Sequence, residues 1–148
     1  MGFISKKVLE TPPSATVSIA DRVTEMRRQG VSVIDFSAGR AVENTPSSAL
    51  KSIWKDWEKR CLYAASEINT IPKLSCDTPE GGFYAWIDIS ETGETSVEFG
   101  ERLLEEQHVA LIPGSAFGPS GEGFMRMTCV RSWDDLRTGL SRLKKSLT

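Results

Sequence analysis

The sequence has few of the residues that build metal centres and disulfide frameworks. It contains one histidine, His108, and three widely spaced cysteines, Cys61, Cys76 and Cys129, without a Cys-x-x-Cys pair. A histidine at a helix end or on the surface is more common than one in a Cys–His pair, and a lone histidine argues against a zinc site. Scattered cysteines in odd number are typical of reduced thiols in a cytosolic protein. We therefore expect no metal site and a cytoplasmic location.

Long apolar runs and an excess of positive charge are also missing. No run approaches the roughly 20 residues that a membrane helix needs, and no apolar signal segment follows Lys6 and Lys7. The net charge of −2 lacks the basic footprint of a nucleic-acid-binding protein. With 39% hydrophobic and 26% charged residues, the composition fits one soluble domain over residues 1–148. We expect neither nucleic acid nor a membrane as its partner.

Hydrophobic periodicity divides the chain into alternating helices and strands. Helices are expected over residues 14–28, from Thr45 to Ile68, from Thr95 to about Gln107, and from Ser132 to Leu147. Strands are expected over residues 31–36, 73–76, 83–89, 109–112 and 124–130. Because the order is not strictly βαβ, we predict an α+β fold, or a loose α/β fold. It should contain a small mixed sheet of about four or five strands, with helices packed on one face.

Each predicted helix carries an apolar stripe that should face the core. In the longest helix the stripe is Leu50, Ile53, Trp54, Trp57, Cys61, Ala64, Ala65 and Ile68. In the helix after Thr95 it is Val97, Gly100, Leu103 and Leu104, and in the last helix Leu136, Leu140, Leu143 and Leu147. Two tryptophans one turn apart are more often packing residues than ligand-binding residues. Thr95 with Glu98 has the spacing of a capping box.

An arginine lies in the middle of the last predicted strand. The strand follows a loop with four glycines, which allow tight backbone turns. Side chains alternate along a strand, so Arg126 shares its face with Phe124 and Thr128, while Met125, Met127 and Cys129 should meet the helices. An unpaired guanidinium is costly to bury, so Arg126 lies either on an open, solvated face or opposite an anion.

Several segments resemble one enzyme family. Residues 113–118, Pro-Gly-Ser-Ala-Phe-Gly, and 121–126, Gly-Glu-Gly-Phe-Met-Arg, are similar to the C-terminal part of class I/II aminotransferases of the aspartate aminotransferase type. Residues 79–84, Pro-Glu-Gly-Gly-Phe-Tyr, also resemble that part. Residues 33–39, Val-Ile-Asp-Phe-Ser-Ala-Gly, resemble the family's N-terminal segment. The resemblance assigns residues 1–46 to the N-terminal segment and 57–148 to the C-terminal segment. Together these form the small domain of fold-type I aminotransferases.

The resemblance implies two residues that bind the substrate α-carboxylate. Arg126 matches the arginine that binds it, and Gly39 matches the glycine whose backbone amide contacts it. The sequence departs from the family at residues 41–43, which are Ala-Val-Glu where the family has proline, aspartate and phenylalanine.

The same resemblance implies that the large, cofactor-binding domain is absent. That domain carries the pyridoxal phosphate, its Schiff-base lysine, the aspartate on the pyridine nitrogen and the phosphate-binding residues, and none has a counterpart here. The family reaction transfers an amino group between an amino acid and a 2-oxo acid and needs these groups. We therefore expect no cofactor and no catalytic residue in a truncated, aspartate-aminotransferase-like protein that is inactive alone. The alternatives are an aminotransferase completed by a separate large-domain chain, or a carboxylate-binding or regulatory partner of an intact aminotransferase.

Surface left uncovered by such a deletion favours self-association. We expect a symmetric homodimer formed through residues 37–45, Phe117 and the segment around Phe3 and Ile4. In the competing arrangement, residues 1–13 fold back over the same surface within one chain. A small carboxylic acid is the expected ligand.

Overall fold

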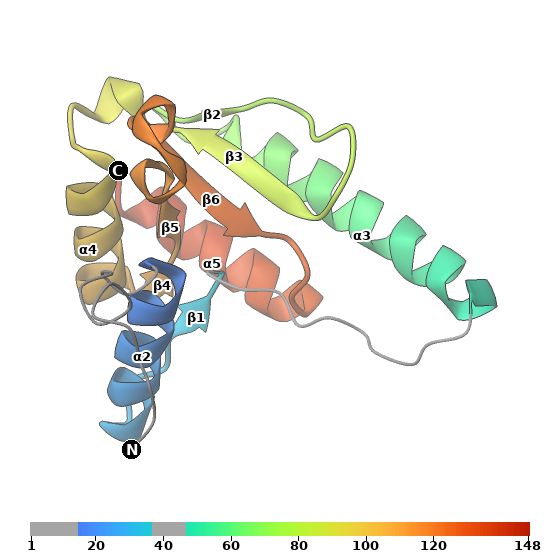
Figure 1. Ribbon diagram of the computed structural model, residues 1–148, viewed down its shortest axis with the longest axis horizontal. Helices are drawn as coiled ribbons and strands as arrows, with labels where there is room; N and C mark the ends of the chain where they lie inside the picture. The colour runs from blue at the N-terminus through green and yellow to red at the C-terminus, as the bar shows by residue number, and fades with distance from the viewer. Residues whose placement is uncertain (1–14, 37–46) are drawn as a thin grey trace, which may run out of the picture.

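The computed structural model describes residues 15–36 and 47–148 (Figure 1). These contain four α-helices, α2 (Ala15–Arg28), α3 (Ser47–Ile68), α4 (Ser96–Gln107) and α5 (Trp133–Lys145). The strands are β1 (Ile34–Asp35), β2 (Ser75–Cys76), β3 (Tyr84–Asp88), β4 (Val109–Ala110), β5 (Ile112–Pro113) and β6 (Phe124–Thr128). Short 3-10 helices occur at η1 (Ser90–Thr92), η2 (Gly114–Phe117) and η3 (Pro119–Gly121). Of the helices in this part of the chain, none has the length and apolar character to cross a membrane.

The strands form two sheets rather than the single mixed sheet predicted. The larger sheet has the order β2-β3-β6-β5, with every neighbouring pair antiparallel, and the smaller is the parallel pair β1-β4. The strand predicted over residues 109–112 is divided between them. Val109 pairs with Ile34 of β1, whereas Ile112 pairs with Arg126 of β6. The α+β class is therefore confirmed, but a uniform apolar run does not show where the chain changes partner.

Helices α3, α4 and α5 pack on one face of the four-stranded sheet. Ala85, Ile87, Met125 and Met127 are at most 1% exposed and belong to one core cluster with residues of α3, α4 and α5. Figure 1 shows α3 and α5 behind the strands and the opposite face of the sheet toward the viewer. The predicted methionine face is thus confirmed. The other face is called the open face below.

Helix ends follow the local chemistry of the sequence. The Thr95 side chain accepts a hydrogen bond from the Glu98 backbone N–H, and Glu98 accepts one from the Thr95 backbone N–H, as predicted for a capping box. Inside α4, however, Val97 is 47% exposed and Phe99 is fully buried, so this part of the predicted stripe is wrong. Gly100 lies on the inner side as predicted, where an added Cβ would be 3.1 Å from Met125 Cε.

The apolar stripe of α3 is buried along part of its length. Cys61, Ala64, Ala65 and Ile68 are at most 3% exposed, but Trp54 is 54% exposed, against the prediction that it faces the core. Trp54 is exposed because α3 is longer than the strands on which it packs. The 22 residues of α3 extend about 33 Å, whereas the five-residue strands β3 and β6 extend about 17 Å. Figure 1 shows the N-terminal part of α3 extending beyond the strands.

Some sequence predictions fall outside the described residues. These are Gly39, residues 37–45, the segment 1–13, and the helix start at Thr45-Pro46. Phe117, the remaining part of the predicted dimer surface, is 48% exposed. Self-association and a cytoplasmic location stay predictions.

Candidate functional site: an arginine held between aromatic rings

The open face of the sheet carries an arginine within a group of aromatic side chains. Tyr84 and Trp86 alternate with the buried residues of β3, and Phe124 and Arg126 alternate with those of β6. The antiparallel register places Trp86 directly opposite Arg126. Phe117, from η2, completes the group. Period-two alternation on two neighbouring strands therefore brings these side chains together.

The Arg126 guanidinium lies between two rings. Its central carbon is 4.4 Å from the centroid of the Tyr84 ring and 4.4 Å from that of the Phe117 ring. Cation–π attraction stabilises both contacts. The N–H donors of a guanidinium lie in its own plane, and contacts with the two rings restrict where that plane can point. The rings fix the orientation of a group that is otherwise carried by a long, flexible side chain.

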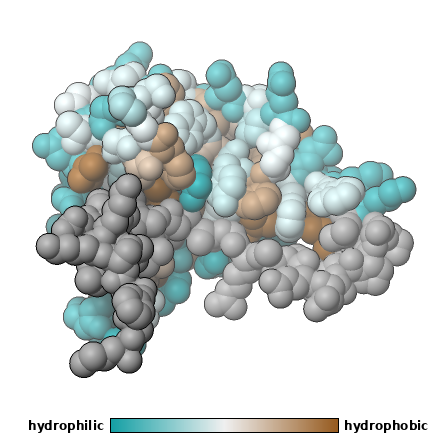
Figure 2. All heavy atoms as spheres, in the orientation of Figure 1, coloured by the Kyte–Doolittle hydropathy of each residue, from teal (hydrophilic) through white to brown (hydrophobic). Residues whose placement is uncertain are grey.

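Trp86 extends the aromatic surface. Its ring lies 5.7 Å from that of Phe117 in an edge-on arrangement and 5.8 Å from that of Phe124 in a stacked one. Trp86 is 38% exposed. Next to it is a hollow of about 500 Å³, within the size range of small-molecule sites. Ser75, Asp77, Tyr84, Trp86 and Phe124 are among its lining residues. In Figure 2 hydrophobic and weakly polar side chains cover this part of the molecule, with hydrophilic ones around them.

A closed glycine loop positions Phe117. The backbones of Gly114 and Gly121 touch, and a Cβ on Gly114 would lie 2.1 Å from the Gly121 carbonyl oxygen. Glu122 then ties the loop to the start of α4. Its carboxylate accepts hydrogen bonds from the Ser96 backbone N–H at 2.6 Å and the Gly123 N–H at 3.1 Å. The Ser96 hydroxyl lies 2.9 Å from both Glu122 Oε2 and Ser115 Oγ.

These hydrogen bonds make the stability of the loop dependent on pH. The Ser96 backbone N–H and then its hydroxyl lower the pKa of Glu122. A carboxyl whose pKa is lowered by folding stabilises the fold above its unfolded pKa, about 4.3, and this contribution is lost as pH falls through the folded pKa.

Glu122→Gln is therefore expected to destabilise the protein at neutral pH and much less in acid. Urea midpoints measured at about pH 7 and about pH 3 test this difference. Glu101→Gln, at an exposed position in α4, is the matched control. An equal decrease in the urea midpoint of Glu122→Gln at both pH values would contradict a stabilising role for the Glu122 carboxylate.

Comparison with known proteins assigns the chain to a family. The family model for class I and II aminotransferases matches residues 19–143, and the chain belongs to this family. It is 34% identical over 118 residues to an aspartate aminotransferase of Pyrococcus abyssi, covering 79% of this chain and 30% of that protein. An aromatic-amino-acid aminotransferase of Thermococcus litoralis is 31% identical, with the same coverage.

Solved structures agree with the sequence comparison. The aromatic aminotransferase of Pyrococcus horikoshii matches with a TM-score of 0.66 and 33% identity, over 68% of this chain and 26% of that one. The aspartate aminotransferase of Rhizobium meliloti gives a TM-score of 0.63 and 32% identity, over 70% and 28%. The chain thus spans about a quarter to a third of the length of these relatives.

The described residues do not fit the cofactor of the family. A matching aminotransferase structure from Clostridium difficile is bound to pyridoxal phosphate. The cofactor lysine must be held in a shielded site, where its amine can form and exchange an imine. Every lysine in the described part of the chain is exposed, namely Lys51, Lys55, Lys59, Lys73, Lys144 and Lys145. We therefore assign no cofactor-binding residue here.

The sequence located the arginine but not its surroundings. Arg126 lies on the sheet face opposite the methionines, as predicted, and is half-buried there, whereas Gly39 lies outside the described residues. The sequence does not mark Tyr84 and Trp86 as site residues. Their alternation with Ala85 and Ile87 was a signal for an outward face, but the register that sets Trp86 opposite Arg126 is not encoded in either strand alone.

Proposed function

We propose that this chain binds small carboxylic acids through Arg126, as the substrate-carboxylate side of an aspartate-type aminotransferase, and does not transaminate by itself. The observation that carries the proposal is the position of the Arg126 guanidinium, on the open face between Tyr84 and Phe117. A carboxylate matches the planar fork of a guanidinium and accepts two parallel hydrogen bonds from it. The Tyr84 and Phe117 rings lower the local polarity, which strengthens charge-assisted hydrogen bonds.

The proposal includes the origin of the two segments. We propose that residues 1–46 and 57–148 correspond to the two ends of an aminotransferase and together form its small domain. The parallel pairing of β1 with β4 supports this, because it joins a strand of the first segment to the second. Gly39 is proposed to add a backbone amide to the carboxylate site.

A second candidate is an enzyme completed by a separate chain. The chain covers 30% of the Pyrococcus abyssi protein, and in this alternative a separate chain supplies a counterpart of the remaining part. A carboxylate-binding partner of an intact aminotransferase would use the same open face. Both alternatives keep Arg126 as the residue that holds the carboxylate.

Calorimetric titration with succinate tests the proposal. Arg126→Ala is expected to weaken succinate binding at least about tenfold, because a hydrogen bond to a charged group contributes about 1.5–3 kcal/mol. Arg126→Lys should bind succinate with an affinity between those of the unmodified chain and Arg126→Ala, since lysine keeps the charge but loses the planar fork. Succinamide, which is neutral, should bind weakly to every variant.

A distant arginine provides the matched control. Arg137 lies on α5, forms an ion pair with Asp134 at 3.8 Å, and its side chain is 60% exposed. Arg137→Ala should bind succinate like the unmodified chain. Circular dichroism shows whether each variant is folded. Equal succinate affinity in a folded Arg126→Ala variant, or equal binding of succinamide and succinate, would overturn the proposal.

A further inference from the structure

The long helix α3 has one face that takes no part in its packing on the sheet or on α5. Its inner face meets the core through Ala64, Ala65 and Ile68. A second face meets α5, where Asp56 pairs with Arg60 at 2.6 Å and accepts a hydrogen bond from the Trp133 indole N–H at 3.3 Å. The remaining face is called the outer face below. Its spacing along the helix places five exposed residues on one side, namely Lys51, Trp54, Lys55, Glu58 and Leu62.

The outer face exposes two large apolar side chains. Trp54 is 54% exposed and Leu62 is 46% exposed. Among the described residues, the other large hydrophobic side chains with such exposure are Trp86 and Phe117, at the Arg126 site, and Val97 on α4. Large apolar side chains gathered on one exposed face indicate a contact surface. The outer face is therefore a second such surface, apart from the Arg126 site.

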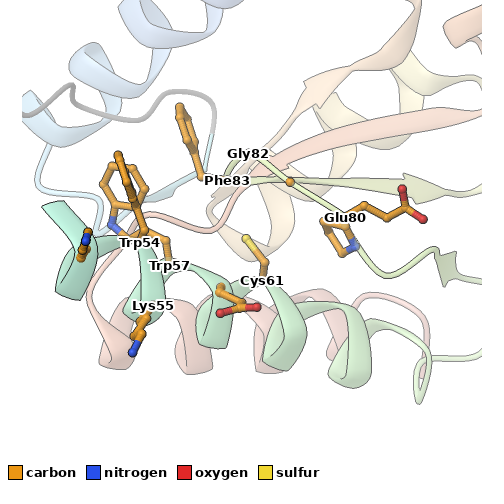
Figure 3. Close-up of a pocket in the computed structure, with 11 residues that line it drawn as sticks. Trp54, Lys55, Trp57, Cys61, Glu80, Gly82 and Phe83 are labelled. Carbon is orange, nitrogen blue, oxygen red and sulfur yellow. The ribbon is translucent and has the colours of Figure 1, made fainter.

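A hollow of about 760 Å³ opens beside the outer face. Trp54 and Trp57 of α3 form one wall, and residues 79–83 form the other. The Trp57 and Phe83 rings meet edge-on at 5.5 Å. Figure 3 shows both tryptophan side chains on one side of α3, with Lys55 pointing away from the aromatic rings. The hollow has room for a tryptophan side chain, and a tryptophan seated in a pocket is a common energetic centre of protein interfaces.

The charges on the outer face are ordered along the helix. Lys51 and Lys55 lie toward its N-terminus, and Glu58 lies beyond them. Within residues 15–36 and 47–148, none of these three side chains forms an ion pair. A second α3 that runs antiparallel brings the lysines of each copy to the glutamate of the other, whereas a parallel one sets like charges together. The charge order is therefore complementary to that of an antiparallel second copy.

We propose that two copies of this chain dock through their outer faces, with the two α3 helices antiparallel. A two-fold axis that passes between residues 56 and 57 sets Lys55 of each copy level with the partner's Glu58. The same axis sets Trp54 level with residue 59 of the partner, beside the hollow that Trp57 and Cys61 line. Each copy thus places its Trp54 in the hollow of the other. Such a contact is closed, because the same surface is used on both copies.

Sedimentation equilibrium of the full chain tests the dimer. As the concentration rises from about 1 µM to about 200 µM, the mass should increase from that of one chain, 16.3 kDa, toward that of two. Trp54→Ala should raise the dissociation constant of the dimer at least about 30-fold, because it empties the hollow of both copies. Val97→Ala is the matched control. Val97 is 47% exposed but lies on α4, so this variant should dimerise like the unmodified chain.

Charge variants test the antiparallel order without changing Trp54. Glu58→Lys gives the outer face charges of positive sign alone, and the double variant Lys51→Glu, Lys55→Glu gives it charges of negative sign alone. Each variant should stay monomeric by itself, and an equimolar mixture of the two should form a mixed dimer. Glu101→Lys, at an exposed position in α4, is the control for a change of charge and should dimerise like the unmodified chain.

Circular dichroism shows whether each variant is folded. A monomer at every concentration would overturn the proposal, because the hollow would then be left open or be covered by something other than a second copy. A dimer that Phe117→Ala dissociates and Trp54→Ala does not would also overturn it, as would oppositely charged variants that do not combine. None of these outcomes depends on carboxylate binding at Arg126.

Discussion

Gly114→Ala is expected to lower the free energy of unfolding by about 3 kcal/mol, at the upper end of the usual cost of overpacking. The added Cβ would lie 2.1 Å from the Gly121 carbonyl oxygen and 2.7 Å from that of Phe124. Both are backbone atoms, which cannot move aside by changing a rotamer. In Gly121→Ala the added Cβ would lie 2.0 Å from the Gly114 carbonyl oxygen. This variant should therefore lower the free energy of unfolding by a similar amount.

Urea unfolding followed by circular dichroism measures this effect. Gly81→Ala is the control, because no atom lies within 4 Å of a Cβ at that position and its backbone is not left-handed. It should change stability by less than about 0.5 kcal/mol. Because the same loop carries Phe117, Gly114→Ala should also weaken succinate binding. Equal stability of the Gly114 and Gly81 variants would show that the loop is not closed in solution.

The purified chain incubated with pyridoxal phosphate, an amino acid and a 2-oxo acid is expected to show no transamination above the rate of the free cofactor. The reaction needs a lysine that holds the cofactor as an imine and moves the substrate proton. All described lysines are exposed, and none is enclosed together with Arg126. Borohydride should therefore trap pyridoxal phosphate at low yield on several surface lysines.

Mass spectrometry of the borohydride-treated chain and a coupled assay for the 2-oxo acid product measure this outcome. A single pyridoxyl-lysine at full occupancy, together with turnover, would contradict it. A denatured sample of the same chain is the control for surface labelling. Turnover that appears after a second chain is added would favour the completed-enzyme alternative, and Arg126→Ala should then reduce it.

Local chemistry explains which parts of the fold were predictable. The capping box at Thr95 and Glu98 lies within four residues, and the alternation of Met125 with Arg126 lies within one strand, so both are present in the sequence itself. The exposure of Trp54 was not predictable from its helical stripe, because it depends on the length of the sheet beneath α3. The division of residues 109–112 between two sheets likewise depends on partners far away in the chain.

The surroundings of Arg126 could likewise not be predicted from the sequence, because they depend on residues distant in the chain. The sequence indicated Arg126 because a charged residue within an apolar strand is unusual and because its motif resembles a family. The rings that hold its guanidinium belong to Tyr84, on a neighbouring strand, and Phe117, in the glycine loop. Their meeting depends on strand register and loop closure.

A carboxylate is expected to bind at Arg126 on the open face. Titration of the isotopically labelled chain with succinate, followed by NMR of the tryptophan indole N–H signals, tests it most directly. The indole signals of the four tryptophans are probes of different parts of the molecule. Trp86 lies opposite Arg126, Trp54 and Trp57 are on α3, and Trp133 is on α5. We expect the Trp86 signal to shift saturably while the other three stay in place, and this shift to disappear in Arg126→Ala. A Trp86 signal that does not move, or that moves equally in Arg126→Ala, would contradict the claim.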